Sequence, residues 1–354
     1  MTLFDHPAFA GHEIVHAGHD EKTGLKAIIA VHSTARGPSC GGTRMWPYES
    51  AEAALIDVLN LSRAMSYKSA VADLELGGGK SVIIGDSRTM KSPELFEAFG
   101  RIVEQLGGRY WAAEDVGVSP EDLAHARGTT EYVVGLPGHP AGSGDPSPVT
   151  AEGVFRGLRL AVKHGYGSED LSGVRVAVQG VGHVGGPLCE KLHAAGARLT
   201  VTDVNQEALR QVAAMTGAEV VAPDAIFDVD AEVFAPCALG AAVNAQTLPR
   251  IKGRVIAGAA NNQLASVEIG QAIFERGLIY APDYVINGGG IINVASEMRG
   301  LQRGEAFDPE WVEGKMRRLM ETLDEILTRS REERRPSHEL ADEIGRARIA
   351  EARG

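Results

Sequence analysis

Apolar positions in the first third of the chain predict an amphipathic helix and a buried strand. Between residues 51 and 68, apolar residues recur at intervals of three and four, which is the spacing of one helix face. The last position on this face is Lys68, so a lysine stands in line with residues that we expect to be buried. Residues 81–84, Ser-Val-Ile-Ile, form an apolar run typical of a buried strand. Ser92 and Ser119, each followed by proline, predict the starts of two further helices.

The second half of the chain alternates between short apolar strands and helical runs. This alternation is typical of a parallel sheet covered by helices on both faces, so we predict an α/β fold. After Asp308 the pattern becomes helical and charged. The predicted strands are 174–179, 198–202, 233–234, 255–257 and 278–280, and a predicted helix lies at 188–195.

Proline and glycine are concentrated in residues 137–148, between these two patterns. Such a composition sustains neither a helix nor a central strand, so we expect a linker there. We therefore place the boundary between two domains at this segment, with residues 1–145 in the first and 146–329 in the second. Ligand sites are common at domain junctions, which draws attention to the polar residues that flank the linker.

The composition excludes several classes of protein. With 44% apolar and 23% charged residues among 354, the chain has the balance of a globular protein. With a net charge of −12, the chain lacks the excess of basic residues that is typical of a nucleic-acid-binding protein. We expect neither a membrane helix nor a signal peptide, because the apolar runs are short and the N-terminus is not basic. Three widely spaced cysteines, Cys40, Cys189 and Cys237, argue against a disulfide framework and favour the cytoplasm.

A dinucleotide-binding fingerprint follows the predicted strand 174–179. Its glycines permit a tight turn, a close approach of backbone to a pyrophosphate, and close packing of the following helix. Asp203 ends the next strand 23 residues after Gly180, where an acidic residue binds the ribose 2′-hydroxyl of NAD and repels the 2′-phosphate of NADP. We therefore predict an NAD site and expect His183 to be a solvent-facing spacer. The fingerprint residues are Gly180, Val181, Gly182, His183, Val184 and Gly185.

Lys80 follows three glycines and is the strongest candidate for acid–base chemistry. The sequence Gly79-Lys80-Ser81 imitates a nucleoside-triphosphate loop, but position 74, which that motif requires to be glycine, is Leu74. Lys68 lies twelve residues earlier, and two ammonium groups in one poorly hydrated cleft would lower the pKa of at least one of them. A lysine tuned in this way is suited to be a general base. Alternatively, Lys68 is an ordinary lysine whose head group reaches water from the helix end.

Asp115 adds a carboxylate just before the predicted helix start at Ser119, although a turn or capping residue would fit the same position. His12, His16 and His19 recur at intervals of three and four, but no carboxylate or thiol pattern accompanies them. We therefore expect no metal site.

Five ordered motifs give the chain a family resemblance that extends roughly from Gly37 to Glu297. Together they resemble the glutamate/leucine/phenylalanine/valine dehydrogenase superfamily, and the segments 41–46, 235–240, 280–287 and 292–297 are most similar to its leucine-type members. The five motifs are Gly41-Gly-Thr-Arg44, Tyr67-Lys68, Gly77-Gly-Gly-Lys80, Glu114-Asp-Val-Gly117 and Ala259-Ala-Asn-Asn-Gln263.

The resemblance implies an α/β substrate domain over 1–145, completed by helices of about 330–354 that return to it. It also implies a Rossmann-type, doubly wound NAD domain over 146–329. The implied reaction is reversible: an L-amino acid, water and NAD⁺ give a 2-oxo acid, ammonium and NADH. A homo-oligomer is implied as well. By the matched motifs, Lys80 activates water and Asp115 exchanges protons with the substrate amine.

The resemblance also assigns binding roles. Lys68 and the backbone N–H groups of Gly41 and Gly42 would hold the substrate carboxylate. Asn262 would orient the substrate and the nicotinamide, and Thr150 would bind the carboxamide.

The side-chain pocket implied by the resemblance is apolar. It consists of Cys40, Ala113, Ile291 and Val294, and it lacks the lysine that would bind a γ-carboxylate. Leucine-type enzymes usually carry leucine where this chain has the smaller Cys40. A branched-chain substrate is therefore our first hypothesis, and a phenylalanine- or tryptophan-type substrate is the alternative. A catalytically silent NAD sensor is a further alternative, against which Lys80 and Asp115 argue.

Overall fold

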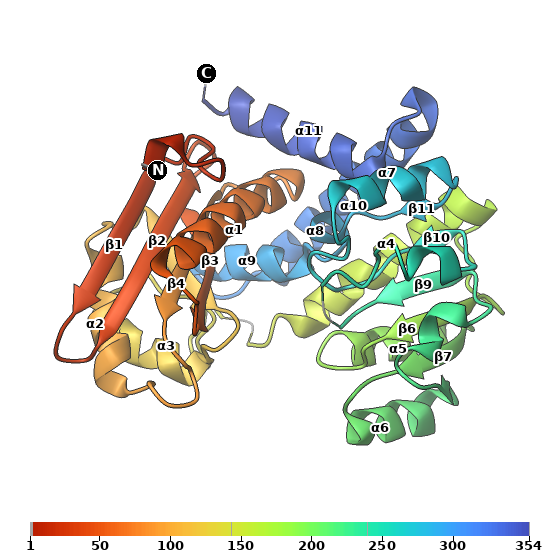
Figure 1. Ribbon diagram of the computed structural model, residues 1–354, viewed down its shortest axis with the longest axis horizontal. Coiled ribbons are helices and arrows are strands. Elements are labelled where there is room, and N and C mark those ends of the chain that lie inside the picture. Colours follow the sequence, from red (N-terminus) through yellow and green to blue (C-terminus); the bar gives the residue numbers. More distant parts are fainter. Residues whose placement is uncertain (1–2, 143, 239, 354) are drawn as a thin grey trace. The chain divides into compact units, whose positions relative to one another are not determined.

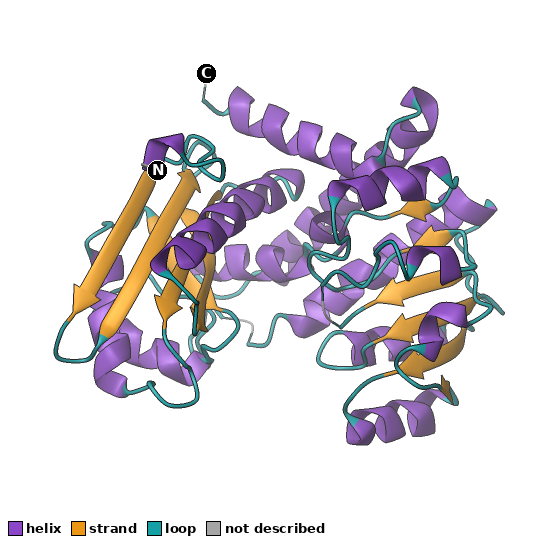
Figure 2. Ribbon diagram, viewed as in Figure 1, coloured by secondary structure: helices purple, strands orange, loops and turns teal. Residues whose placement is uncertain are grey.

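A computed structural model describes residues 3–142, 144–238 and 240–353, and it divides the chain into two compact units. Unit 1 comprises Met1–Asp145, Asn293–Val312 and Ile344–Gly354, and unit 2 comprises Pro146–Ile292 and Glu313–Glu343. Ser143 of the expected linker and Leu239 of a leucine-type segment lie outside the described residues. Figure 1 labels the elements and Figure 2 shows the α/β character of both units, as expected from the sequence.

Unit 1 is built on a five-stranded mixed sheet with the order β1-β2-β4-β3-β5. β3 pairs in parallel with both β4 and β5, whereas β2 pairs antiparallel with β1 and β4. Three parallel strands therefore end at one edge of the sheet. The strands are β1 (Ile14–Asp20), β2 (Leu25–Ser33), β3 (Ser39–Trp46), β4 (Gly77–Ile84) and β5 (Tyr110–Glu114).

Helices cover both faces of this sheet. Alternate residues of β2 belong to different cores: Ala30 packs in a cluster with Val58 of α1, and Ile29 packs in a cluster with Phe96 of α2. The side chains of Ser92 and Ser119 cap α2 and α3, as the sequence predicted, because each serine accepts a backbone N–H of the first turn. The elements are η1 (Leu3–Asp5), α1 (Ala51–Val71), α2 (Pro93–Glu104) and α3 (Pro120–Arg127).

The buried face of α1 follows the predicted apolar stripe only in part, because Val58 is fully buried whereas Leu61 and Met65 are half-buried. In its second half the helix also meets the sheet through serines, and a Cβ on Gly78 of β4 would lie 2.0 Å from the backbone nitrogen of Ser66. Lys68, on the expected stripe, is only half-buried. Close approach of the helix to a glycine strand therefore outweighs apolar periodicity in this helix.

Unit 2 is built on a six-stranded, wholly parallel sheet with the order β11-β10-β9-β6-β7-β8. The chain moves from β6 outward to β8, and then restarts at β9 on the other side of β6. This reversal is the topological switch point at which doubly wound sheets bind ligands. The strands are β6 (Arg175–Gln179), β7 (Arg198–Thr202), β8 (Glu219–Val220), β9 (Val233–Pro236), β10 (Val255–Ile256) and β11 (Ile279–Tyr280).

The helices of unit 2 lie on both faces of its sheet. On β10, Val255 lies against α4 at Gly165, whereas the next residue, Ile256, packs with Ile273 of α7 in the core of the opposite face. The helices are α4 (Ser147–Tyr166), α5 (Gly185–Ala194), α6 (Gln206–Thr216), η2 (Ala225–Asp228), η3 (Leu248–Arg250), α7 (Val267–Glu275) and α8 (Asp283–Ile286).

Three C-terminal helices, α9 (Gly289–Arg303), α10 (Pro309–Glu333) and α11 (Ser337–Glu351), each contribute residues to both units. The sequence-based ranges differ here, because residues 293–312 were expected in the second domain and belong to unit 1. In the same way, residues 330–343 were expected to return to the first domain and belong to unit 2. Within unit 1, Glu297 of α9 accepts the N–H of Gly135 at 2.9 Å, and Arg348 of α11 donates to the carbonyl oxygen of Val71 at 2.8 Å.

Other differences concern the N-terminal hairpin and β4. The sequence patterns did not reveal β1 and β2, and His16 and His19 lie on β1 instead of a helix. β4 begins at Gly77, four residues before the apolar run that predicted it. None of the helices in the described part of the chain is long and apolar enough to cross a membrane.

Candidate active site

Lys80 and Asp115 form a close ion pair in unit 1. Lys80 lies in the middle of β4, Asp115 directly follows β5, and β3 pairs with both strands between them. Lys80 Nζ lies 2.5 Å from Asp115 Oδ2, and the lysine side chain is only 8% exposed. The two residues predicted to carry the proton chemistry are therefore adjacent, although 35 positions separate them in the sequence.

The environment shifts both pKa values. Burial lowers the pKa of Lys80 and overcomes the opposing effect of the Asp115 carboxylate; the nearby Arg44 guanidinium lowers it further. Burial alone would raise the pKa of Asp115, but Lys80 and Arg44 outweigh it and hold that pKa below its usual value. The sequence pattern predicts Lys68 as the cation that lowers the pKa of Lys80, whereas in the structure Arg44 is a cation that does so.

Two glycines of β3 allow close packing beside this pair. A Cβ on Gly42 would lie 3.0 Å from Lys80 Nζ and 2.6 Å from the carbonyl oxygen of Glu114. A Cβ on Gly41 would lie 1.8 Å from the carbonyl oxygen of Gly79 on β4. Neither position has room for a side chain, so glycine is what allows β3 to pack this closely against its neighbours and the two ionisable groups.

A second set of polar side chains continues from Asp115 towards α1. Arg44 Nε donates to Asp115 Oδ2 at 3.3 Å, and its Nη1 donates to Asp57 Oδ2 at 3.0 Å. The same Asp57 oxygen accepts the hydroxyl of Tyr48 at 2.5 Å. These partners were not predicted from the sequence. Arg44 stands in the glycine motif, but no local spacing indicates its contact with Asp57.

The remaining predicted substrate residues are distributed over both units. Cys40 is fully buried on β3, and burial raises its pKa to about 12, so its small side chain carries a neutral thiol. Ala113 is half-buried on β5. Val294 belongs to unit 1, whereas Ile291 belongs to unit 2, so the four-residue pocket remains a prediction.

The glycine fingerprint lies at the switch point of unit 2. Gly180 has a φ of 98°, and a Cβ there would lie 2.8 Å from Ala238, which follows β9. Asp203 Oδ2 accepts the backbone N–H of Val181 at 2.7 Å, which holds the carboxylate beside the loop. Val184 provides no side-chain cap for α5, so the helix start presents N–H groups suited to a phosphate. His183 is exposed, in keeping with the spacer position expected from the sequence.

Asn262 and Thr150 both lie in unit 2. Asn262 has a φ of 51°, a left-handed conformation that asparagine tolerates better than most residues. Its loop is anchored at Gln263, whose N–H donates to Asp283 at 2.8 Å. Thr150 occupies the first turn of α4, where its hydroxyl donates to the carbonyl oxygen of Pro146 at 3.0 Å.

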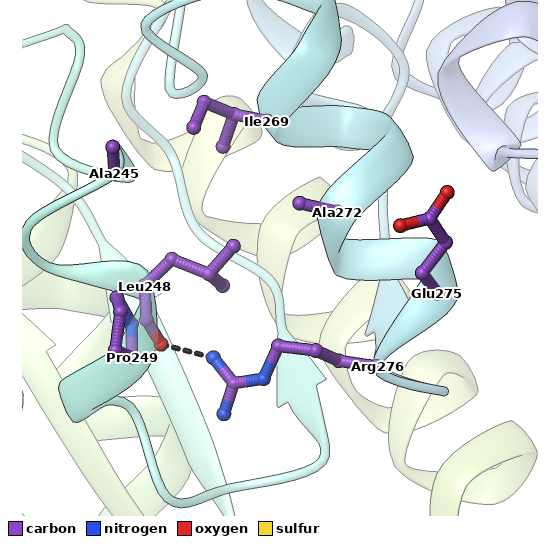
Figure 3. Close-up of a pocket in the computed structure, with 7 residues that line it drawn as sticks. All are labelled: Ala245, Leu248, Pro249, Ile269, Ala272, Glu275 and Arg276. Carbon is purple, nitrogen blue, oxygen red and sulfur yellow. Dashed lines mark hydrogen bonds between the residues drawn. The ribbon is translucent and has the colours of Figure 1, made fainter.

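A cavity of about 580 Å³ opens elsewhere in unit 2, and Arg276 and Leu248 hydrogen-bond at its edge (Figure 3). It involves none of the fingerprint residues. In the part of the chain that the structure describes, no group of three or more side chains is arranged to hold a metal ion. The cavity is lined by Ala245, Leu248, Pro249, Ile269, Ala272, Glu275 and Arg276.

Comparison with known proteins identifies the family. Residues 12–132 match the family model of the Glu/Leu/Phe/Val dehydrogenase dimerisation domain, and residues 200–354 match the model of glutamate/leucine/phenylalanine/valine dehydrogenase. The chain belongs to this dehydrogenase family. The family resemblance drawn from the motifs is thus confirmed, and the chain is an amino acid dehydrogenase.

Similar members of the family cover almost the whole chain. Leucine dehydrogenase of Bacillus subtilis (strain 168) is 47% identical over all of this chain and 95% of its own length. Phenylalanine dehydrogenase of Bacillus thermotolerans is 46% identical over 86% of this chain and 80% of its own length. The crystal structure of L-tryptophan dehydrogenase from Nostoc punctiforme superposes with a TM-score of 0.84 at 40% identity, with 97% of each chain covered. The two-domain, Rossmann-type α/β architecture of this family is therefore also that of the present chain.

Proposed function

We propose that this dehydrogenase oxidatively deaminates a branched-chain L-amino acid, with NAD⁺ as the oxidant, to a 2-oxo acid, ammonium and NADH. The observation that carries the proposal is the buried Lys80–Asp115 pair at 2.5 Å, in a chain 47% identical to a leucine dehydrogenase over its full length. An amine and a carboxylate held side by side, each with a lowered pKa, are suited to act as proton acceptors in the hydrolysis of an imino group.

The two residues have different tasks. Asp115, held ionised by Lys80 and Arg44, accepts a proton from the substrate ammonium group and later returns one to the leaving ammonia. Lys80, whose pKa is lowered by burial, accepts a proton from the water that attacks the imino carbon. Lys68 and the backbone of Gly41 and Gly42 bind the substrate carboxylate.

Unit 2 supplies residues that fit a dinucleotide. The uncapped start of α5 suits the pyrophosphate, and the loop at Gly182 has open space where a Cβ would stand. Asp203 suits a ribose 2′-hydroxyl, Thr150 suits the carboxamide and Asn262 suits the nicotinamide side. The bound dinucleotide would supply hydride acceptance.

A larger aromatic substrate is the second candidate. Cys40 supports it, because this buried residue is smaller than the leucine usual in leucine-type enzymes. The similarity to a phenylalanine dehydrogenase and to L-tryptophan dehydrogenase also supports it.

NADH formation with a panel of L-amino acids tests both candidates. We expect leucine, isoleucine and valine to give the highest kcat/KM, and rates to rise above neutral pH as Lys80 deprotonates. Higher kcat/KM for phenylalanine or tryptophan would favour the aromatic alternative. No turnover of any amino acid would contradict both.

Cofactor choice is tested separately. We expect NAD⁺ to give a much higher kcat/KM than NADP⁺, because the Asp203 carboxylate would repel a 2′-phosphate. Asp203→Ser should narrow this preference, and an exposed acidic control on the same unit, Glu219→Ser, should leave it unchanged. Equal efficiency of the unmodified enzyme with both cofactors would contradict this role of Asp203.

We also propose a cytoplasmic homo-oligomer. The family model matching residues 12–132 is that of a dimerisation domain, and the three cysteines are free, as expected in a reducing compartment. Light scattering at micromolar concentration should give a mass of at least two chains; a monomer would contradict the proposal.

A further inference from the structure

Arg44 of β3 lies beside the Lys80–Asp115 pair and contacts two carboxylates on different elements. It donates from Nε to Asp115 Oδ2 at 3.3 Å and from Nη1 to Asp57 Oδ2 on α1 at 3.0 Å. Both cations that hold Asp115 lie closest to the same oxygen, Oδ2. The Arg44 side chain is 25% exposed and that of Asp57 is 28% exposed, so solvent screens this pair only in part.

The two cations on Asp115 differ in one chemical respect. A lysine that activates water has to be neutral for part of the cycle, and it then no longer stabilises a carboxylate by its charge. Arginine does not lose its proton in proteins. When Lys80 is neutral, the fixed charge beside Asp115 is therefore that of Arg44.

We propose that Arg44 is a positioning residue that fixes the Asp115 carboxylate against Lys80 and keeps it ionised while Lys80 is neutral. The inference rests on the proposed deaminase function, in which Asp115 has to accept a proton from the substrate. Asp57 holds Arg44 in turn, and Tyr48 fixes Asp57 through the 2.5 Å hydrogen bond of its hydroxyl.

The charges around the pair agree in direction with this role. Arg44 lowers the pKa of both Lys80 and Asp115, whereas Asp57 raises the pKa of Lys80. These opposite signs give the proposal a test that a purely structural defect would not reproduce. The titratable or charged groups that interact with the pair are Cys40 and Arg44 on β3, Tyr48 before α1, Asp57 on α1 and Tyr110 on β5, and Glu297 on α9 acts in turn on Cys40.

The test is the pH profile of kcat/KM, measured by NADH absorbance with NAD⁺ and the preferred amino acid. On the acidic side of this profile, which we call the acidic limb, kcat/KM rises with pH. In Arg44→Gln the acidic limb should move to higher pH by about one pH unit or more, because the pKa values of Lys80 and Asp115 both rise. Arg44→Lys should restore most of the limb's position, since the charge returns. Asp57→Asn should move the limb to lower pH.

Arg36→Gln is a matched control, because Arg36 forms a half-buried pair with Asp73 at 2.7 Å in the same unit. Its profile should coincide with that of the unmodified enzyme. The proposal is overturned if Arg44→Gln leaves the limb in place, whether or not activity falls, or if Asp57→Asn moves it to higher pH. If Arg44→Gln does not fold, the direction of the Asp57→Asn shift decides. An unmodified enzyme that turns over no amino acid would instead contradict the proposed function itself.

Discussion

At the scale of single residues, the chemistry depends on strand register. Parallel pairing of β3 with β4 and β5 brings Lys80 and Asp115 to a 2.5 Å contact across the position of Gly42. The sequence identified both side chains by type and motif, but it could not give their separation, because no local spacing encodes a register between strands. The contacts of Arg44 were missed for the same reason.

Lys80 and Lys68 should be separable by kinetics. Lys80→Ala should lower kcat by at least about 10²-fold, because a general base acts mainly in the transition state. Lys68→Ala should mainly raise KM for the amino acid, since a carboxylate is bound in ground and transition states alike. Steady-state kinetics in both substrates measures this. A near-normal kcat in Lys80→Ala would contradict the assignment of Lys80 as the base and would make Asp115 the leading candidate.

Gly42→Ala should abolish most of the activity without unfolding the protein. The added methyl group would lie 2.6 Å from the carbonyl oxygen of Glu114, 2.7 Å from Asp115 Cβ and 3.0 Å from Lys80 Nζ, so it would displace the end of β5 and push the pair apart. We expect a fall in kcat/KM of at least about tenfold, which is the effect of about 1.4 kcal/mol in the transition state. An unchanged circular dichroism spectrum is the control, and wild-type activity would show that the pair tolerates displacement.

At the scale of elements, strongly patterned segments were predictable and closely packed ones were not. The strand at 198–202 and the caps of α2 and α3 follow from apolar runs and serine–proline signals. The packing of the second half of α1 does not, because its serines meet glycines of β4, and small residues at such a contact do not continue the apolar stripe by which a helix face is recognised. The hairpin of β1 and β2 was not predicted because β1 has no buried residue; its positions are half-buried or exposed, and its sequence does not alternate clearly between apolar and polar residues.

Glycine substitutions should report on this close packing. Gly78→Ala places a Cβ 2.0 Å from the Ser66 backbone nitrogen, and we expect destabilisation by about 1–3 kcal/mol. Gly314→Ala, in α10 with open space around its Cβ, should instead stabilise by about 0.5–1 kcal/mol. Chemical denaturation measures both. Equal stability of Gly78→Ala and the unmodified chain would mean that α1 can move away from β4.

At the scale of the whole molecule, stability should depend on two buried histidines of unit 1. The rings of His12 and His32 lie 5.0 Å apart, and His32 Nδ1 hydrogen-bonds Ser66 Oγ at 2.8 Å. Burial, helped by the charges of His12, Arg353 and Arg63, lowers the pKa of His32 to about 4. The unfolded chain therefore binds a proton more readily than the folded chain between about pH 6.5 and 4.

This difference predicts a loss of stability on acidification. The contribution of His32 is fully present above about pH 6.5 and disappears as the pH falls towards 4, and it amounts to about 1–2 kcal/mol between pH 7 and 5. In His32→Asn, the decrease in unfolding free energy between these two pH values should be smaller by that amount. Identical pH slopes for the two proteins would mean that His32 takes up its proton in the folded state.

The three-segment construction of unit 1 has a consequence for how the chain is made. A ribosome releases residues 1–145 long before 344–354, yet Arg348 donates to the carbonyl oxygens of Ala70 and Val71 at the end of α1. The end of α1, just after Lys68, thus obtains these partners only after residue 348 has been synthesised. A chain that stops before Arg348 would carry both Lys80 and Asp115, the residues proposed to act in catalysis, and would still lack these two hydrogen bonds to the end of α1.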